Sequence, residues 1–293
     1  MQCGLSIMTV LKNKGASGLQ IAFLILAVLL LAVPADRYLF SRWRWAAEMN
    51  IPIDRMAILV GAGILFMAVA PLRRICADLL SQPIPGAKLP EVAAVTLLDF
   101  CVGCAALGAF ALWWWWTGGQ AEVARHFAGA SDIAELEKAL SIGGVVTSLL
   151  LAGLLAPIIE ELVFRGLLYR AWQRQWGWFP AAIASSMIFA LAHPRTLYPQ
   201  FFAGLLEVCV YRRTGSLRAA ILMHAVFNVS LWYPLAGQFV LPAGRESGRL
   251  EAWTQNFVCL AVAIVALPLY LWMSRDAQIN HSRAANAVDA VGA

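Results

Sequence analysis

Three charged residues inside an apolar stretch constrain the fold of this chain more than any other feature. The uncharged run 142–156 leads through Pro157 directly to Glu160, Glu161 and Arg165. Each charge near the middle of a bilayer costs roughly 2.5–3.5 kcal/mol, so three such groups must be paired or hydrated. Ionisable groups at this depth usually mark a functional site, and their partners are expected on other apolar segments of the chain.

The composition identifies the surroundings of this stretch. The chain is 61% hydrophobic and only 13% charged, whereas a soluble domain is typically about 45–50% apolar and about 25% charged. We therefore expect an integral membrane protein in contact with the lipid bilayer. The net charge of +5 does not indicate a nucleic-acid partner, because the lysines and arginines lie in short connections between apolar runs, where they set membrane orientation.

The apolar segments predict an all-α polytopic membrane protein with about eight transmembrane helices. The predicted spans are 19–34, 55–72, 91–116, 142–170, 179–193, 200–211, 216–233 and 253–273. An even number of spans places both termini on one side, and the basic connections indicate the cytoplasm. We expect the bacterial inner membrane. The chain divides into an N-terminal membrane region (1–141), a core (142–233) and a last span with its tail (234–293).

Several other patterns have a simpler interpretation. The run 19–34 ends like a signal-peptide cleavage site, but many spans follow, so we expect an uncleaved first helix. The segment 15–18 matches the Gly-x-Ser-Gly pattern of rhomboid proteases, yet it precedes the first span and has no second catalytic element. Cys101 and Cys104 have redox-pair spacing and are interpreted as small packing residues on an apolar helix. Asp99 is expected to face a polar neighbour or the headgroups.

Pro157 predicts an irregularity in the fourth span. It lacks a backbone N–H and crowds the carbonyl of Gly153. We therefore expect the helix to kink one turn before the two glutamates.

Polar residues on two later spans are the expected partners. Phe189 and His193 are four residues apart, as are His224 and Asn228, so each pair shares one helical face. Counted from the cytoplasmic ends, Glu160, His193 and His224 lie roughly 15, 21 and 12 Å deep. The sequence thus predicts one buried polar site among helices 4, 5 and 7, open toward the cytoplasm.

The spacing of these residues suggests hydrolysis. Glu161 and Arg165 are four apart and can form an ion pair, whereas Glu160 points about 100° away and can face the histidines. A carboxylate in a poorly solvated site is a stronger base than one in water. Amide hydrolysis also needs donors for the developing oxyanion, and His224 with Asn228 can supply them.

These residues form three motifs that resemble those of a known family. The motifs are Glu160-Glu161-x-x-x-Arg165, Phe189-x-x-x-His193 and His224-x-x-x-Asn228, in this order and on separate predicted spans. They resemble the motifs of the CPBP family, the CAAX-protease and bacteriocin-processing (Abi) family of intramembrane proteases. The resemblance covers residues 142–233.

The resemblance implies an eight-helix fold and a glutamate-dependent intramembrane peptidase. By that analogy Glu160 and His193 activate water, and His224 and Asn228 form the oxyanion site. Glu161 and Arg165 would support them. The implied substrate is a membrane-associated protein or peptide, processed at a CAAX-type end or a C-terminal sorting tail.

Alternatives remain at this stage. Two histidines and a glutamate can bind zinc, but His-Glu-x-x-His is absent and an activated water accounts for the same residues, so we expect no metal and no cofactor. A non-catalytic peptide-binding or immunity protein would need no base, and a transporter should show an inverted repeat, which is not seen. Glu207 is expected to pair with Arg212 or another interfacial arginine, outside the site.

Overall fold

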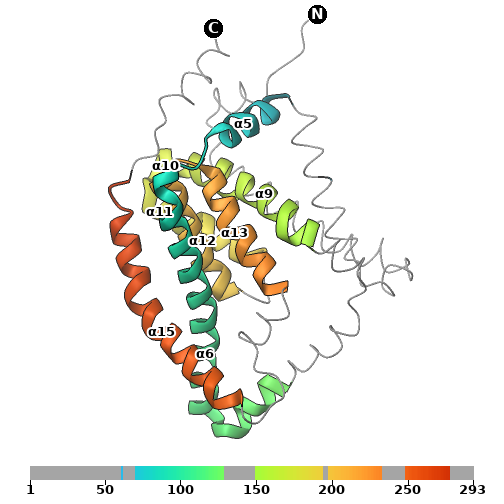
Figure 1. Ribbon diagram of the computed structural model, residues 1–293, viewed down its shortest axis with the longest axis vertical. Helices are drawn as coiled ribbons and strands as arrows, with labels where there is room; N and C mark the ends of the chain where they lie inside the picture. Colours follow the sequence, from blue (N-terminus) through green and yellow to red (C-terminus); the bar gives the residue numbers. More distant parts are fainter. Residues whose placement is uncertain (1–60, 62–69, 129–148, 194–196, 233–247, 278–293) are drawn as a thin grey trace, which may run out of the picture.

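The computed structural model describes residues 61, 70–128, 149–193, 197–232 and 248–277, which are almost entirely helical and include no strand (Figure 1). The predicted first span, nearly all of the second and the segment 15–18 lie outside the described residues. The described helices are α5 (Ala70–Ser81), η1 (Gly86–Lys88), α6 (Leu89–Ala128), η3 (Leu149–Leu155), α9 (Ala156–Glu161), η4 (Leu162–Tyr169), α10 (Arg170–Trp176), α11 (Trp178–Leu191), α12 (Leu197–Thr214), α13 (Leu217–Trp232) and α15 (Gly248–Met273).

Two long helices, α6 and α15, pack side by side along one edge of the molecule (Figure 1). Within the described residues, Gly86–Glu122 and Asn256–Met273 are long and apolar enough to cross a membrane. The described residues thus contain two candidate membrane spans, while the number of eight spans stays a prediction. The helical path of α6 breaks at Gly119, where φ is 67°, a conformation that favours glycine.

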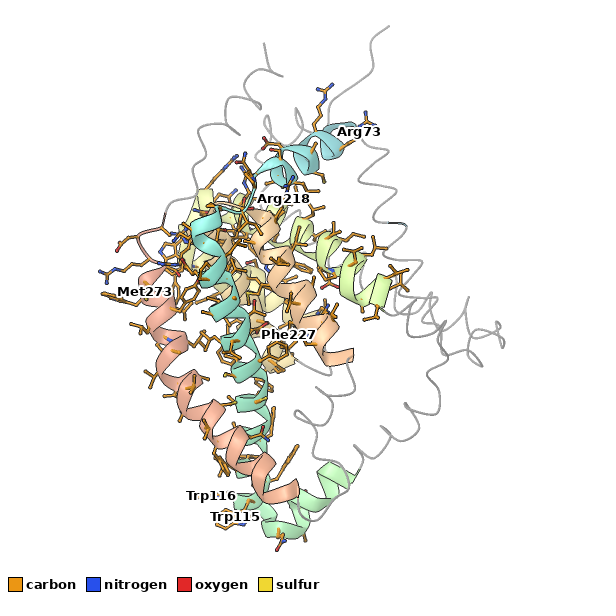
Figure 2. The ribbon with its side chains drawn as sticks, in the orientation of Figure 1. Arg73, Trp115, Trp116, Arg218, Phe227 and Met273 are labelled. Atoms are coloured by element: carbon orange, nitrogen blue, oxygen red, sulfur yellow. The ribbon has the colours of Figure 1, made fainter. Side chains whose placement is uncertain are left out.

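Four consecutive tryptophans, residues 113–116, lie just before this break. Trp115 and Trp116 lie at the lower end of the molecule in Figure 2, and the Trp116 side chain is 84% exposed. Exposed tryptophans at one end of an apolar helix are typical of a membrane interface.

Helix α12 is the centre of the fold. All residues from Ala203 to Arg212 are buried, and α12 contacts α6, α11, α13 and α15. It joins two hydrophobic clusters: Val208 packs in one with Phe189, and Leu206 packs in the other with Met223. A helix enclosed on all sides must satisfy its polar side chains within the protein.

The predicted fourth span is not a regular α-helix. Two π-helical segments, η3 and η4, flank the short α9, whose first turn contains Pro157. The helix type changes just before Pro157, while the predicted kink stays a prediction. Segments of π-helix are often found at functional sites. Gly153 lets η3 approach α13 closely, because a Cβ there would lie 2.7 Å from Val229 Cγ2.

A left-handed glycine sets the direction of α13. Gly215 has φ 69° and donates its N–H to the carbonyl of Tyr211 at 2.9 Å, which ends α12 as glycine commonly ends helices. The chain then returns as α13 alongside α12. This reversal brings Glu207 and His224 face to face across the two helices.

Polar contacts join the helices at the end of the bundle opposite the tryptophans. Arg213 on α12 forms an ion pair with Glu91 on α6, and Glu91 also accepts a hydrogen bond from the Tyr270 hydroxyl at 3.1 Å. Figure 2 shows Arg73 and Arg218 at this upper end. One end of the helix bundle is thus basic and the other aromatic.

The cysteine pair belongs to a helix contact. Cys104 is buried and Cys101 is half-buried, and both lie near Cys259 of α15. All three are free thiols. The interpretation of Cys101 and Cys104 as packing residues agrees with this arrangement.

Candidate active site

The two adjacent glutamates at the end of α9 face different surroundings. Glu161 is fully buried and accepts a hydrogen bond from Arg165 Nη1 at 2.8 Å, as its i, i+4 spacing predicts. The Glu160 side chain is 21% exposed and points toward the histidines. The divergence follows from the turn of roughly 100° per residue in α9. One glutamate is therefore held inside the protein while its neighbour is accessible.

The histidines lie on either side of the Glu160 carboxylate. His193 Nε2 is 4.0 Å from Glu160 Oε1, and His224 Nε2 is 3.7 Å from Glu160 Oε2. Both distances are too long for a direct hydrogen bond and suit a bridging water. The three side chains come from different helices, since His193 follows α11 and His224 lies on α13.

Each histidine is oriented through its other nitrogen. His193 Nδ1 lies 2.9 Å from the carbonyl of Phe189, so Nδ1 carries the proton and Nε2 is an acceptor in the neutral ring. His224 Nδ1 lies 3.0 Å from Glu161 Oε1. Helix α11 ends at Leu191, two residues before the predicted end, and His193 continues the turn by donating its N–H to Ala190.

The ring of Phe189 connects these groups. Its centroid is 4.4 Å from the guanidinium carbon of Arg165, 4.8 Å from the His193 ring and 5.8 Å from the His224 ring. Phe189 itself is completely buried. The motif phenylalanine thus fixes both imidazoles and supplies a cation–π contact to the buried arginine.

Asn228 has a partner outside the predicted oxyanion site. Its Nδ2 donates to the carbonyl of Ala152 in η3 at 2.8 Å, which ties α13 to the π-helical segment. An amide NH₂ carries two hydrogens, so this bond uses one of the two donors. The oxyanion role of Asn228 stays a proposal.

Glu207 also lies at the site, although the sequence predicted a position outside it. The prediction that it pairs with Arg212 was wrong. Glu207 Oε2 accepts from Arg165 Nη2, and Oε1 lies 3.3 Å from His224 Nδ1. Arg212 instead donates to the Tyr169 hydroxyl at 3.1 Å. The sequence does contain a signal for this position, because Glu207, like Glu160, is an acidic residue inside an apolar helix.

Asp99 of α6 lies behind the site. It is 2% exposed, and its electrostatic partners are Glu207, Arg165 and Glu161. Asp99 therefore faces polar neighbours inside the protein and not the headgroups.

One donor set in the described residues has metal-site geometry. Ligand atoms of Glu161, Glu207 and His224 all lie within 4.8 Å of one another. However, the Arg165 guanidinium donates a hydrogen bond to each of the two carboxylates. This set therefore does not fit a cation, which would compete with that guanidinium for the same oxygens.

Gly204 is required for the close approach of Arg165 and α12. A Cβ at this position would lie 2.9 Å from Ser186 Cβ and 3.1 Å from Arg165 Nη2. We expect Gly204→Ala to lower the free energy of unfolding by about 1–3 kcal/mol, the usual range for overpacking. Thermal unfolding in detergent measures this change. The control is Gly86→Ala, whose Cβ would meet nothing within 4 Å; equal stability of the two variants would contradict the packing described.

Comparisons with known proteins concern the same part of the chain. Residues 142–230 match the family model described as "Type II CAAX prenyl endopeptidase Rce1-like". This segment is therefore similar to that family over 89 of the chain's 293 residues. The finding confirms, for that segment, the resemblance to CAAX proteases predicted from the three motifs.

One curated relative matches part of the chain. It is an Escherichia coli protein described as an "Uncharacterized 24.3 kDa protein", 32% identical over 91 residues. The match covers 29% of this chain and 42% of that protein, so the chain spans less than half the length of this relative. No solved structure matches the chain.

Proposed function

We propose that the protein is an intramembrane endopeptidase that hydrolyses a peptide bond with a water activated by Glu160 and His193. The convergence of Glu160, His193 and His224 from three helices, within a segment that matches an endopeptidase family, carries this proposal. Glu160 and His193 are the accessible members, with side chains 21% and 30% exposed, while Glu161 and Arg165 are buried behind them. This division is expected for a reacting pair and its support.

The chemistry follows from the two approximately 4 Å spacings around Glu160. A water between Glu160 and His193 gives its proton to the Glu160 carboxylate as its oxygen attacks the substrate carbonyl carbon. His224 Nε2 faces the same space, and a proton there stabilises the oxyanion. When the C–N bond breaks, Glu160 returns the proton to the leaving amine. The net reaction is addition of one water across the amide.

The proposed substrate is a membrane-associated protein or peptide whose C-terminal end is processed, either at a CAAX-type motif or at a sorting tail. The support is the description of the matched family and the apolar helices around the site. We also propose that the basic end of the bundle, where Arg73 and Arg218 lie (Figure 2), faces the cytoplasm of a bacterial inner membrane.

The substrate class can be tested with the reconstituted protein. Vesicle-bound peptides ending in Cys-aliphatic-aliphatic-X are offered with and without an isoprenyl group on the cysteine, and mass spectrometry detects the released tripeptide. We expect release by the wild type and a loss of about 10²-fold or more in His193→Gln, because this variant cannot orient the water in the same way. Retention of the peptide without any cleavage would favour the non-catalytic binding function instead.

A further inference from the structure

Both ring nitrogens of His224 face carboxylates. Nδ1 lies 3.0 Å from Glu161 Oε1 and 3.3 Å from Glu207 Oε1, and Nε2 lies 3.7 Å from Glu160 Oε2. A neutral imidazole has one N–H, so with that proton on Nδ1 its Nε2 can only accept a hydrogen bond, as from a water in the 3.7 Å gap to Glu160. Only the imidazolium can donate from both nitrogens. The His224 side chain is 6% exposed, so water screens these contacts little.

When its carboxyl groups are ionised, the cluster around the His224 ring needs more positive charge than Arg165 supplies. Carboxyl groups face the cluster from several elements, with one guanidinium and a second imidazole. These groups are Glu160 and Glu161 of α9, Glu207 of α12, Asp99 of α6, Arg165 of η4 and His193 after α11. Within the inner group, Glu161 and Glu207 exceed Arg165 by one negative charge when both carboxyl groups are ionised. Buried carboxylates without compensation are strongly unfavourable, and an imidazolium at His224 restores neutrality.

Glu207 is the residue that creates this imbalance. Its Oε2 accepts a hydrogen bond from Arg165, so one guanidinium is shared between Glu161 and Glu207. Its Oε1 lies against His224. Gly204, one turn earlier on α12, provides the space for Arg165 to reach it. None of the three motifs contains Glu207. Its two oxygens are thus divided between the cation of one motif and the imidazole of another.

We propose that Glu207 is a positioning residue: together with Glu161 it holds His224 as an imidazolium, with Nδ1–H directed at the two carboxylates and Nε2–H directed toward Glu160 and the substrate carbonyl. The proposal rests on the endopeptidase function for its catalytic consequence. A charged donor makes hydrogen bonds roughly twice as strong as a neutral one. An imidazolium therefore stabilises the oxyanion more than a neutral ring does.

The charge state of His224 can be measured without any substrate. The chain has four histidines, so ¹⁵N-histidine solid-state NMR of the protein in bilayers resolves few signals, and His224→Asn identifies the one to follow. We expect both His224 nitrogens to be protonated at pH 7 in the wild type and one of them to lose its proton in Glu207→Gln. A neutral His224 in the wild type, with the proton shared by Glu161 and Glu207, overturns the proposal.

The catalytic consequence is tested by kinetics over pH. Removing the Glu207 charge makes the imidazolium easier to deprotonate, so the activity of Glu207→Gln is lost at lower pH on the basic side, by about one pH unit. At pH 7 we expect kcat to fall about ten- to a hundredfold with KM within about twofold, and Glu207→Asp to recover part of kcat. The control is Glu91→Gln, which removes another carboxylate that pairs with an arginine of α12; it should leave the pH profile unchanged.

The outcomes separate the two proposals. A wild type that cleaves nothing contradicts the endopeptidase function, while the NMR signal still decides the role of Glu207. A second outcome is that Glu207→Gln loses stability while its imidazolium signal and pH profile stay unchanged. In that case Glu207 only packs against Arg165, and the inference is overturned. If Glu207→Gln does not fold, the NMR measurement on the wild type decides, because a neutral His224 there overturns the proposal.

Discussion

Glu160→Gln is expected to lower kcat by about 10²- to 10⁴-fold, the range typical of a lost general base. Glutamine keeps the size of the side chain but cannot take a proton from water. Folding should survive, because the Glu160 side chain is 21% exposed, whereas Glu161 is the glutamate that pairs with the buried Arg165. The measurement is single-turnover cleavage of a vesicle-bound peptide, which reports chemistry separately from product release.

Glu160→Asp and Glu91→Gln are the controls for this variant. Aspartate keeps the base but moves it about one methylene away, so part of kcat should return, whereas Glu91→Gln alters an ion pair at the end of the bundle and should leave kcat unchanged. Equal kcat values for Glu160→Gln and the wild type would exclude Glu160 as the base.

Arg165→Met should have the largest effect on stability. Arg165 is 1% exposed, donates to the buried Glu161 and Glu207, and lies over the Phe189 ring. Removing one partner of a buried ion pair costs about 3–5 kcal/mol, because the remaining charge has no compensation. We expect a large fall in the thermal midpoint and in the folded fraction recovered in detergent.

A triple variant separates charge from packing at this position. Arg165→Met combined with Glu161→Gln and Glu207→Gln removes the cation and both carboxylates, so most of the lost stability should return. The triple variant should nevertheless be inactive, since His224 loses both acidic partners. If the triple variant is no more stable than Arg165→Met alone, uncompensated charge is not the cause of the destabilisation.

Local features of the sequence predicted much of the fold. Hydrophobic length placed both ends of α11 and α13 to within two residues. Helix α6 continues twelve residues beyond its predicted end, and α15 begins five residues before its predicted start. Helical spacing predicted the Glu161–Arg165 pair and the divergent direction of Glu160, both of which the structure shows. These features depend only on neighbours within one turn, so the sequence contains what is needed to predict them.

Contacts between distant helices could not be predicted in the same way. Glu207 pairs with Arg165 across 42 positions of sequence, and nothing in the spacing of α12 selects that arginine over Arg212 on the same helix. The two π-helical segments around α9 also depend on packing against neighbouring helices. Buried polar groups take the partner that tertiary structure provides, which is often not the nearest in sequence.

The most direct test compares the protein ends in cells that carry the wild type with those in cells that carry Glu160→Gln at equal expression. Mass spectrometry of new N- and C-termini in the membrane fraction, together with released peptides, gives both the substrate and the cleaved bond. The endopeptidase account predicts a defined set of ends that appears only with the wild type. Identical sets of ends, in cells where deletion of the gene still has a phenotype, would contradict it and favour a non-catalytic role.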